Sequence, residues 1–557
     1  MDGQARIQGA QVDIGADESD GSQWPPVIPV VVRVSSSGDD AHDGSSWALA
    51  KRTVQAGVNA AKGHGGEVWV AAGSYAERIV LPPYVSLYGG FAGAEASRDQ
   101  RDWSRNATVL DGGGLGSVVQ VQTGHRVSRI DGFAIRNGNG GGIRCTYSSP
   151  TITNNTIAGN SGGGIYCGSS ALIANNTISG NSVSGSGGGI LCGYSSATIA
   201  NNISSDNSAG SGGGIFCGSS SPTIANNTIT ANSADYCGGI YCYSSSPTIA
   251  NNTIAGNSGG STGGGIYCDS SSPAISNNIV AFNSGGIYRD DRFQGSPTLQ
   301  RNCVFNPDGY NYSGLNPGAT DIHVDPLFVN RAAGDYHLSG ASPCINAGDD
   351  SVVQAGGVDM DGEARIMGAH VDIGSDELDP NPISVTLPAG WNLISLPAHP
   401  LNDDPAVVFT GLPINDQLVR WDCPTLSYVG YWDLFPSDFG PLKVGEGHWL
   451  MLDQPTTISY QGYPTAGTGT VPLPQSGWHL IGQPHNGSTD VNTCSLTGTS
   501  APPVCSVMPI YGWYPAELRY WEVGCDGAPV NDSKVLEPWR GYWLNTPVPN
   551  LSLTIPH

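Results

Sequence analysis

Short β-branched runs alternate with turn residues through the middle of the chain, and they do so with a regular period. The motif Gly-Gly-Ile-x-Cys recurs between Gly141 and Tyr288 at intervals of 22 to 26 residues. Its cysteines are Cys145, Cys167, Cys192, Cys217, Cys242 and Cys268. A second motif, Pro-Thr-Ile-Ala-Asn-Asn-Thr-Ile, lies between copies at 222–229 and 247–254. Neither motif has helical spacing, and this period predicts the coils of a right-handed parallel β-helix, with three short strands in each coil.

Alternation within each strand predicts an inward and an outward row of side chains. Ile165 and Cys167 share one face of their strand, and Tyr166 takes the other. Because isoleucine holds its position in every copy, we expect isoleucines and cysteines to stack inward, with the thiols reduced. An exposed aromatic stripe in the outward row suits stacking against sugar rings, unless a loop or another domain covers it. The candidate carbohydrate-binding residues are Tyr166, Phe216, Tyr241, Tyr267 and Tyr288.

One stretch near the start of the chain has helical spacing. Between residues 46 and 62, Trp47, Val54 and Val58 recur on one face, and Ser45 or Ser46 is a suitable N-cap. A short amphipathic helix there would cover the open end of the first coil, as the terminal units of solenoids must.

The first residues of the chain nearly repeat a later stretch. Residues 1–18 read almost as residues 360–377 do. We therefore expect residues 1–29 to be the tail of a preceding module plus a linker, with an export signal further upstream. The β-helix itself is expected at residues 30–379.

Beyond residue 380 the composition changes, because nine of the thirteen tryptophans lie after residue 390. The pattern of strands and turns predicts two copies of a small β domain, a sandwich or barrel, at 380–470 and 471–557. The repeated segments are Gly390–Pro397 with Gly477–Pro484, and Leu418–Trp421 with Leu518–Trp521.

The tryptophans of these copies lie inside the repeated strand motifs, which favours a place in the core. A carbohydrate-binding module is the alternative. The residues concerned are Trp391, Trp421, Trp478, Trp521 and Trp543. Cys494, Cys505 and Cys525 in the second copy allow one disulfide if the protein is exported.

Several segments resemble a known superfamily. The beginning of the β-helix resembles the first coils of bacterial right-handed parallel β-helix proteins in the pectate-lyase-like superfamily, at Gly66–Val70, Leu87–Phe91 and Val109–Gly112. Its end is similar to the closing segment of the secreted members called choice-of-anchor proteins, at Asp325–Phe328, Ser342–Gly348 and Val371–Gly374. The resemblance covers about residues 30 to 377 and implies the fold. It implies no single activity, because the superfamily holds lyases, hydrolases, adhesins and proteins of no known chemistry.

Charge narrows the classes of partner. The formal net charge of −24 argues against nucleic acid and anionic membranes. The sequence holds no apolar run long enough to span a bilayer, so we expect no membrane insertion. These features are typical of an extracellular or cell-surface protein, and they leave the oligomeric state open.

The central coils lack the residues that catalysis on a polysaccharide needs. Between Thr146 and Tyr288 the acids are Asp206, Asp235 and Asp269, with no Lys, Arg, His or Glu. Proton abstraction needs a base and a positive group, and inverting hydrolysis needs two facing carboxylates. Candidate catalytic residues follow the last coil, at Arg289, Asp290 and Asp291, although a self-neutralised surface turn also explains that cluster.

A second acidic cluster lies at the end of the β-helix. Its carboxylates could bind Ca²⁺ through hard oxygen ligands, although closing turns are often acidic without a metal. The candidate ligands are Asp359, Asp361, Asp372 and Asp376. No other cofactor is expected.

The sequence thus favours a protein that binds polysaccharide or another surface polymer without catalysis. The first alternative is a polysaccharide lyase or glycoside hydrolase with its site at a charged end of the β-helix, around Arg98 to Arg105 or Arg289 to Arg292. The second is a structural spacer in a tandem-repeat surface protein.

Overall fold

The computed structural model describes most of the chain. The described residues are 31–62, 65–124, 128–260, 262–290, 292, 294–353, 357–378, 381–415, 417–464, 469–485, 488–498, 510–515, 519–523, 533 and 535–556. The chain divides into two compact units, residues 1–172 and 173–557. The expected module remnant at 1–29, together with Asp291, Cys505 and Cys525, lies outside the described residues. The domain boundaries drawn from the sequence stay predictions.

A short helix packs on the first strand of the first unit. This helix, α1 (Val54–Ala61), contacts β1 (Val31–Val34). The Thr53 hydroxyl caps it by accepting a hydrogen bond from Ala56 N at 3.2 Å. Close packing depends on Gly57, where an added Cβ would lie 2.5 Å from Val34 Cγ2. The helix therefore begins later than predicted, since Trp47 lies in a separate 3-10 turn, η1 (Trp47–Leu49).

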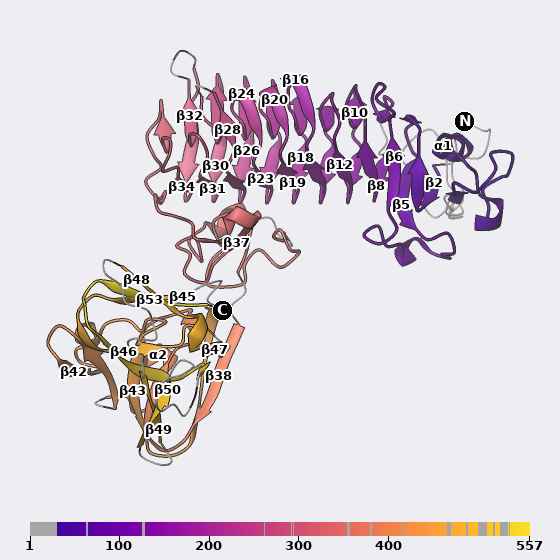
Figure 1. Cartoon of the computed structure of the whole chain (residues 1–557). Helices are drawn as coiled ribbons and strands as arrows, with labels where there is room; N and C mark the ends of the chain where they lie inside the picture. Colours follow the sequence, from indigo (N-terminus) through magenta and orange to yellow (C-terminus); the bar gives the residue numbers. More distant parts are fainter. Residues whose placement is uncertain are drawn as a thin grey trace, which may run out of the picture. The chain divides into compact units, whose positions relative to one another are not determined.

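Parallel strands in three sheets form the coils of the first unit (Figure 1). The first sheet holds, in spatial order, β1, β2 (Glu67–Ala71), β5 (Ser86–Phe91), β8 (Arg129–Asp131) and β11 (Thr151–Thr153). The second holds β4 (Ile79–Leu81), β7 (Val119–Val121), β10 (Ile143–Thr146) and β13 (Ile165–Gly168). The third holds β3 (Gly73–Tyr75), β6 (Thr108–Asp111), β9 (Ala134–Arg136) and β12 (Thr156–Ala158). A 3-10 turn, η2 (Arg98–Gln100), lies in the loop between β5 and β6.

The second unit repeats this arrangement in its own coils. One sheet holds β14 (Leu172–Ala174), β18 (Thr198–Ala200), β22 (Thr223–Ala225), β26 (Thr248–Ala250), β30 (Ala274–Ser276) and β33 (Thr298–Gln300). The next holds β17 (Ile190–Gly193), β21 (Ile215–Gly218), β25 (Ile240–Tyr243), β29 (Ile266–Asp269), β32 (Ile287–Arg289) and β35 (Tyr312–Ser313). The third holds β15 (Thr177–Ser179), β19 (Ile203–Ser205), β23 (Thr228–Thr230), β27 (Thr253–Ala255), β31 (Ile279–Ala281) and β34 (Cys303–Phe305). The predicted parallel β-helix is confirmed.

A fourth sheet, which the sequence did not predict, runs along part of the second unit. Its strands are β16 (Ser182–Ser186), β20 (Ser208–Ser211), β24 (Ser233–Tyr236) and β28 (Ser258–Gly259). The interval from Cys145 to Cys167 is 22 residues, and the later intervals are 25 or 26. The additional residues of the longer coils lengthen one turn enough for neighbouring turns to pair as strands.

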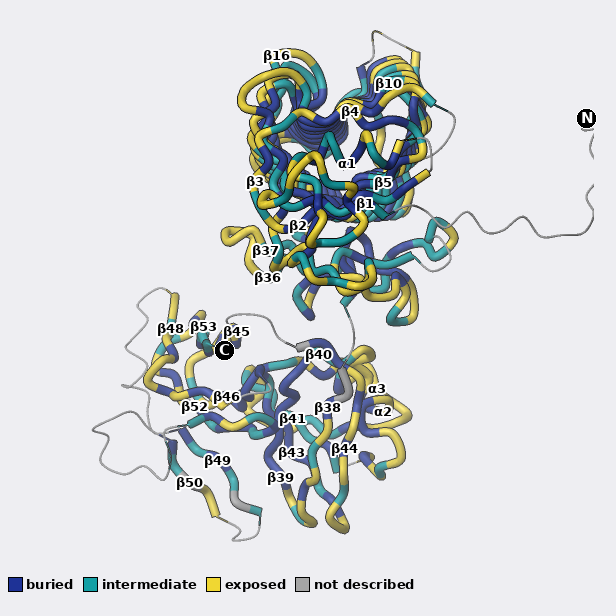
Figure 2. Tube along the Cα trace, turned by 90° about the vertical axis from the view of Figure 1, so that its right-hand side faces the viewer, coloured by how far each residue is buried: buried dark blue, intermediate teal, exposed yellow. Residues whose placement is uncertain are grey.

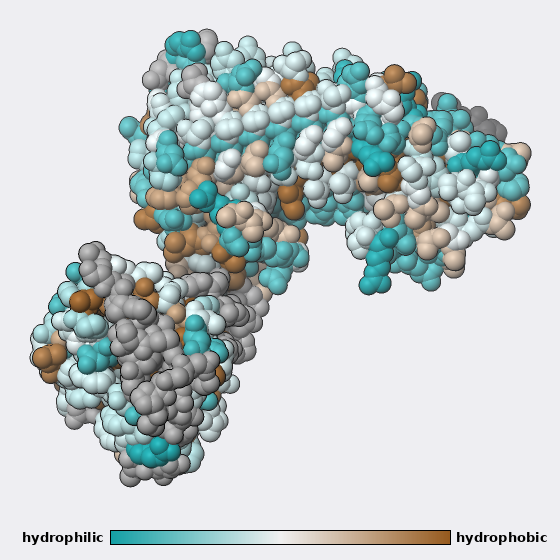
Figure 3. Space-filling model, viewed as in Figure 1, coloured by the Kyte–Doolittle hydropathy of each residue, from teal (hydrophilic) through white to brown (hydrophobic). Residues whose placement is uncertain are grey.

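Isoleucine and cysteine fill the interior of the coils, as predicted. Ile215 pairs in register with Ile240, and Cys217 pairs with Cys242. All four side chains are at most 1% exposed, and both thiols are free. In Figure 2 much of the tube inside the coils is coloured as buried, and the visible face of the coils in Figure 3 is mostly neutral to hydrophilic.

The last coil of the second unit is followed by a compact closing segment. It contains an antiparallel pair, β36 (Phe328–Asn330) with β37 (Asp335–Leu338), and the 3-10 turns η3 (Arg331–Ala333) and η4 (Asp350–Val352). Leu338, Cys344 and Ile373 of this segment form one buried cluster with Ile279 of β31. The segment therefore covers apolar side chains of the final coils. Among the described residues, no helix has the length and apolar character needed to cross a bilayer.

Antiparallel sheets make up the C-terminal part, in two copies. In the first copy a four-stranded sheet runs β39 (Gly390–Ser395), β43 (Gly447–Leu452), β41 (Leu418–Asp422), β42 (Ser427–Gly430), and a three-stranded sheet runs β38 (Asn381–Leu387), β44 (Thr456–Pro464), β40 (Ala398–Pro400). In the second copy the corresponding sheets run β46 (Gly477–Gly482), β52 (Gly541–Thr546), β49 (Ile510–Tyr514), β50 (Arg519–Val523), and β45 (Gly469–Leu473), β53 (Leu551–Ile555), β48 (Ser495–Thr497). Smaller elements are α2 (Pro405–Val408), α3 (Pro436–Phe439), η5 (Val491–Thr493), and the pair β47 (Thr489–Asp490) with β51 (Val535–Leu536).

Each copy has its own buried core, which agrees with the predicted duplication. One detail of the predicted repeat is wrong. In the order of the four-stranded sheets, β49 takes the place of β41, and β50 takes the place of β42. Trp421 therefore corresponds to Trp513, not to Trp521, because the Leu518–Trp521 similarity matches segments one strand apart.

Candidate functional site

Two of the five residues in the predicted aromatic stripe are covered. Tyr241 is 9% exposed and Tyr267 is 3% exposed, so the prediction of an exposed row is wrong for these two residues. Cys237, which directly follows β24, packs against both rings, together with Phe216 and Tyr288. Cys237 and the neighbouring rings of the row thus cover them.

The remaining contacts of the row are internal to the coils. The Tyr241 hydroxyl donates to Asp269 at 3.2 Å, and the Tyr267 hydroxyl donates to Asp290 at 2.9 Å. In the first unit the Arg144 guanidinium lies 4.4 Å from the centroid of the Tyr166 ring. Tyr166, Phe216 and Tyr288 are only half-buried. Their role in carbohydrate binding stays a prediction.

The candidate catalytic cluster is arranged as an ion pair. Asp290 is 2% exposed and accepts hydrogen bonds from Arg292 Nη2 at 2.6 Å and Arg292 Nε at 2.9 Å. These hydrogen bonds hold the pKa of Asp290 far below its usual range, so the carboxylate is ionised and fully engaged. Arg289 Nη1 donates to the Gly295 carbonyl at 3.4 Å.

The other charged end of the coils is also paired. Arg98 Nη1 lies 2.6 Å from Glu67 Oε1, and Arg101 Nη2 lies 2.7 Å from Asp131 Oδ1. Arg101 and Asp131 are both largely buried, so these charges stabilise a loop rather than face a cleft.

Two of the four predicted calcium ligands, Asp359 and Asp372, accept hydrogen bonds from backbone turns of the closing segment. Asp359 accepts hydrogen bonds from the backbone N–H groups of Asp361, Glu363 and Glu377. Asp372 accepts them from Asn346 N and Leu378 N. Both carboxylates therefore tie backbone turns of the closing segment together.

A buried arginine balances part of this acidic charge. Arg365 Nη2 donates to the carbonyls of Asp372 and Gly374, each at 3.0 Å, and lies 3.8 Å from Glu377 Oε2. Burial raises the pKa of Asp372 and of Asp376 to about 6, and that of Glu377 to about 8.

In the described part of the chain, Asp361 and Asp376 come together with His337, with ligand atoms within 4.8 Å of one another. The His337 ring is already hydrogen-bonded, to Asp335 Oδ1 at 2.5 Å and to Asp361 Oδ2 at 3.0 Å. Ca²⁺ binding by the predicted ligands stays a prediction.

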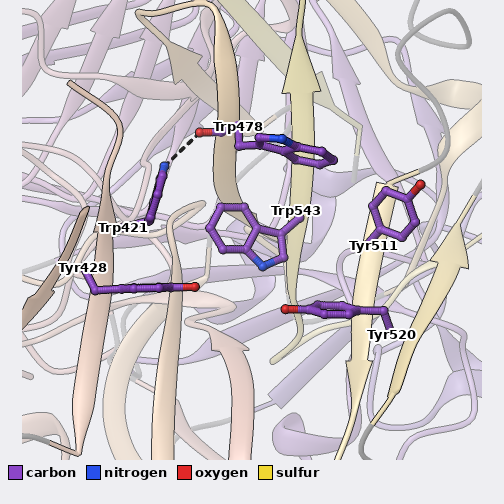
Figure 4. A pocket seen from close by; sticks show the side chains of 6 residues that line it. All are labelled: Trp421, Tyr428, Trp478, Tyr511, Tyr520 and Trp543. Carbon is purple, nitrogen blue, oxygen red and sulfur yellow. Dashed lines mark hydrogen bonds between the residues drawn. The ribbon is translucent and has the colours of Figure 1, made fainter. Parts of the chain in front are cut away.

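Aromatic side chains from both C-terminal copies surround a pocket of about 510 Å³. They come from β41 and β42 in the first copy and from β46, β49, β50 and β52 in the second. Figure 4 shows the hydroxyl ends of Tyr428 and Tyr520 pointing toward one another, with the indole of Trp543 drawn above the gap between them. The lining residues are Trp421, Tyr428, Trp478, Tyr511, Tyr520 and Trp543.

A second pocket of about 450 Å³ adjoins the first. Its lining residues are Trp391, Val419, Tyr428, Trp449, Trp513 and Tyr520. If the two copies are exchanged strand for strand, each residue of the first pocket becomes a residue of the second, and Tyr428 and Tyr520 exchange with one another. The two pockets are thus the same site, built twice.

Hydrogen bonds between the copies occur in equivalent pairs, one in each direction. Trp421 Nε1 donates to the Trp478 carbonyl at 3.0 Å, and Trp513 Nε1 donates to the Trp391 carbonyl at 2.8 Å. Ring contacts agree as well. The Trp421 and Trp543 centroids lie 5.3 Å apart, and those of Trp513 and Trp449 lie 5.4 Å apart. This reciprocal pattern is that of an isologous, two-fold junction.

Glycines allow the copies to approach closely. A Cβ added at Gly447 would lie 2.7 Å from Leu480 Cγ, and one added at the equivalent Gly541 would lie 3.0 Å from Leu393 Cγ. Leu393, Trp449 and Leu480 form a buried cluster across the junction, with Trp421, Trp513 and Trp543 packed on it. The pocket floor is therefore fixed by a packed core.

The pocket walls remain open to solvent. Trp391 is 39% exposed and Trp478 is 41% exposed, so the expectation that the tryptophans belong to the core is wrong for these two. The side chain of Trp521 lies outside the described residues. Tyr428 and Tyr520 are 52% and 47% exposed. Because nearly all lining atoms belong to aromatic rings, the pockets can stack flat, partly apolar groups but offer few charges.

Sequence reasoning missed most of the lining. Tyr428, Trp449, Tyr511, Trp513 and Tyr520 were not singled out, although Tyr511 and Trp513 alternate on one strand face. That alternation is the one local signal of an aromatic surface. No pattern among neighbouring residues shows which residues of the other copy line the opposite side of each pocket.

Comparison with known proteins agrees with the coils. The family described as "Right handed beta helix region" matches residues 104–254 and 210–319. No curated protein matches the chain. A solved structure described as pectate lyase Pel9A is 13% identical, with a TM-score of 0.42, over 62% of this chain and 96% of that one. The complex structure of XylC with xylose is 9% identical, with a TM-score of 0.31, over 54% of this chain and 87% of that one. The family match concerns the fold of the coils.

Proposed function

We propose that the protein, which carries a right-handed parallel β-helix, binds polysaccharide without catalysis, outside the cell or at its surface. Binding takes place in the paired aromatic pockets of the C-terminal copies. The β-helix then serves as a rigid body that carries them.

The observation that supports this proposal is the aromatic lining itself. Six aromatic side chains enclose about 510 Å³, and three of them, Trp478, Tyr428 and Tyr520, are strongly exposed. Exposed aromatic groups gathered in one hollow normally mark a binding site, because water contact with them is unfavourable. The C–H faces of sugar rings pack on indole and phenol rings, and the tyrosine hydroxyls can hydrogen-bond to sugar hydroxyls.

Charge selects among polysaccharides. The chain carries a formal net charge of −24 and has a pI near 4.6. Long-range repulsion therefore disfavours polyanions such as polygalacturonate. A neutral polysaccharide is the expected ligand.

The absence of a suitable charge constellation supports binding over catalysis. Between Thr146 and Tyr288 the sequence holds no Lys, Arg, His or Glu. The charged groups described at the two ends of the coils, Arg98, Arg101 and Asp290, are engaged in ion pairs. A general base with a facing acid is not formed among them.

The proposal is tested by retention of purified protein on cellulose, xylan, mannan, chitin and polygalacturonate, with and without Ca²⁺. Newly released reducing or unsaturated ends are scored in the same samples. We expect retention on a neutral polymer and no released ends. The double variant Tyr428→Ala, Tyr520→Ala should lose retention, whereas Trp432→Ala, an exposed tryptophan outside both pockets, should keep it. Released ends would make the protein an enzyme, and retention on none of the polymers would leave the structural spacer.

A further inference from the structure

We propose that the two aromatic pockets are two equivalent sites that hold two polysaccharide chains in opposite directions, so that one protein molecule cross-links them. This inference rests on the proposed polysaccharide binding and adds its valency and geometry. Nothing in the duplication of the sequence alone requires it.

The relation between the pockets is a two-fold rotation. In a head-to-tail repeat, the contacts that one copy makes would not be returned by the other. Here Gly482 N donates to the Gly445 carbonyl at 2.8 Å, and the equivalent Ser395 N donates to the Trp539 carbonyl at 3.4 Å. The two tryptophan hydrogen bonds between the copies, from Trp421 and from Trp513, form an equivalent pair of the same kind. The copies therefore face each other about an internal dyad.

The dyad passes between the pockets on the face where both open. Tyr428 and Tyr520 line both pockets and exchange under the rotation, so the axis runs between these two side chains. Each pocket also has four residues of its own, including Trp478 in the first and Trp391 in the second. Both volumes fall in the range of small-ligand sites, roughly 300–1,000 Å³. Each pocket is thus complete enough to hold its own ligand.

A polysaccharide chain has a reducing and a non-reducing end, so it has a direction. A two-fold axis through the binding face reverses direction between the two sites. A single straight chain laid over both pockets would run through the second pocket in the direction opposite to that in the first. It could therefore make the favourable contacts in only one of the two pockets. Two chains running in opposite directions satisfy both.

Titration calorimetry with cellohexaose, xylohexaose, mannohexaose and chitohexaose tests the valency. For the oligosaccharide that binds, we expect two per protein molecule. Trp478→Ala and Trp391→Ala should each reduce the number to one. Their backbone carbonyls, which accept the Trp421 and Trp513 hydrogen bonds, remain in both variants. Tyr428→Ala should weaken both sites about ten-fold, through loss of one aromatic contact in each. Trp432→Ala is the matched control and should still bind two.

Ligand length tests the opposite direction of the sites. As the oligosaccharide grows from three to eight sugars, the number bound should stay at two, without the gain in affinity that a chain spanning both sites would produce. With the soluble polymer, the unaltered protein should form cross-linked aggregates, and the two single-tryptophan variants should bind without cross-linking.

The outcomes separate the two proposals. No binding of any oligosaccharide or polymer would overturn the proposed function itself. Binding of one per molecule in the unaltered protein would overturn the two-site inference and leave the function standing. A fall from two to one with increasing length, accompanied by tighter binding, would show one chain filling both pockets.

Discussion

The inner asparagines join successive coils at the scale of single residues. Asn227 is 1% exposed and donates through Nδ2 to the carbonyls of Ile199 and Ala225 and to Asn252 Oδ1, at 2.9 to 3.0 Å. Its own Oδ1 accepts from Asn202 N and Nδ2. Every polar atom of this amide is used, as a buried polar ladder requires.

Replacement of one ladder asparagine should be costly. Asn227→Ala leaves several buried polar groups without partners, and each costs roughly 1–3 kcal/mol. We expect a clearly lower melting temperature, measured by differential scanning calorimetry. Thr223→Ala, at a half-exposed outward position one strand away, is the control and should change little. Equal effects of the two substitutions would contradict a structural role for the amide.

Stability should depend on pH through the closing segment. Burial raises the pKa of Glu377 from its ordinary 4.5 to about 8, so the folded state keeps a proton that the unfolded state releases. The stabilisation is complete below pH 4.5 and is lost as pH rises toward 8. Asp372 and Asp376, each with a pKa of about 6, act in the same direction.

We therefore expect the melting temperature in EDTA to fall between pH 5 and pH 8. The pKa of buried His448 is lowered to about 4, which opposes stability below its ordinary value of 6.5 and places the optimum in mildly acidic solution. Glu377→Gln should flatten the fall toward pH 8. A profile that the variant does not change would refute the assignment. A rise in melting temperature on adding Ca²⁺ at pH 8 would support the predicted ligands at Asp359, Asp361, Asp372 and Asp376.

At the scale of the elements, the strands that carry the cysteine stack exclude solvent from their thiols. Cys145 and Cys167 in the first unit, and Cys217 and Cys242 in the second, carry buried thiols. Burial raises the pKa of the Cys145 thiol well above its ordinary value. At Cys145 both effects suppress the thiolate, which is the reactive form. At Cys242, hydrogen bonds from Cys217 and Cys268 lower the pKa of the thiol to about 5, so its protection rests on burial alone.

The stacked thiols should resist alkylation until the coils unfold. We expect iodoacetamide to leave the peptides with Cys145, Cys217 and Cys242 unmodified in the native protein and to modify them in guanidinium chloride. Peptide mass spectrometry measures this site by site. The half-exposed Cys423 is an internal control and should react in the native state. Native labelling of the stack would contradict the packed interior.

Elements were predictable where one coil repeats the previous one. The repeated motifs around Ile215 and Ile240 predicted the sheet, the register and the inward face. Because equivalent residues stack in register, the position of a residue within its own motif predicts whether it is buried. The fourth sheet was missed, since its serine- and glycine-rich strands have no apolar pattern. The prediction of an exposed aromatic row was wrong for Tyr241 and Tyr267 for a related reason. Alternation assigns Tyr241 to the outer face but cannot tell that Cys237 covers it.

At the scale of the whole molecule, the junction between the C-terminal copies builds both pockets. Gly482 lies at this junction, and an added Cβ there would lie 2.1 Å from Ser395 Cβ. The exchange of copies relates these two positions to one another, so they meet near the axis. One of the two must remain a glycine.

Gly482→Ala should therefore push the copies apart and weaken both pockets together. We expect a lower melting temperature of the antiparallel sheets and loss of oligosaccharide binding, measured by calorimetry. Gly185→Ala is the control, because an added Cβ at Gly185 meets no atom within 4 Å. Loss of only one of the two sites in Gly482→Ala would show that the pockets do not depend on a common junction.

The sequence by itself determined the coils, their inward isoleucine and cysteine rows, the capping helix and the duplication of the C-terminal domain. Each of these follows from a period or an alternation that neighbouring residues carry. Tertiary structure alone decided which aromatic residues are covered and which are exposed. It also decided that Trp421 lies against Trp543 and Trp513 against Trp449. The physical reason is that alternation fixes the side of a strand to which a residue points, whereas the packing of distant segments fixes what, if anything, lies on that side.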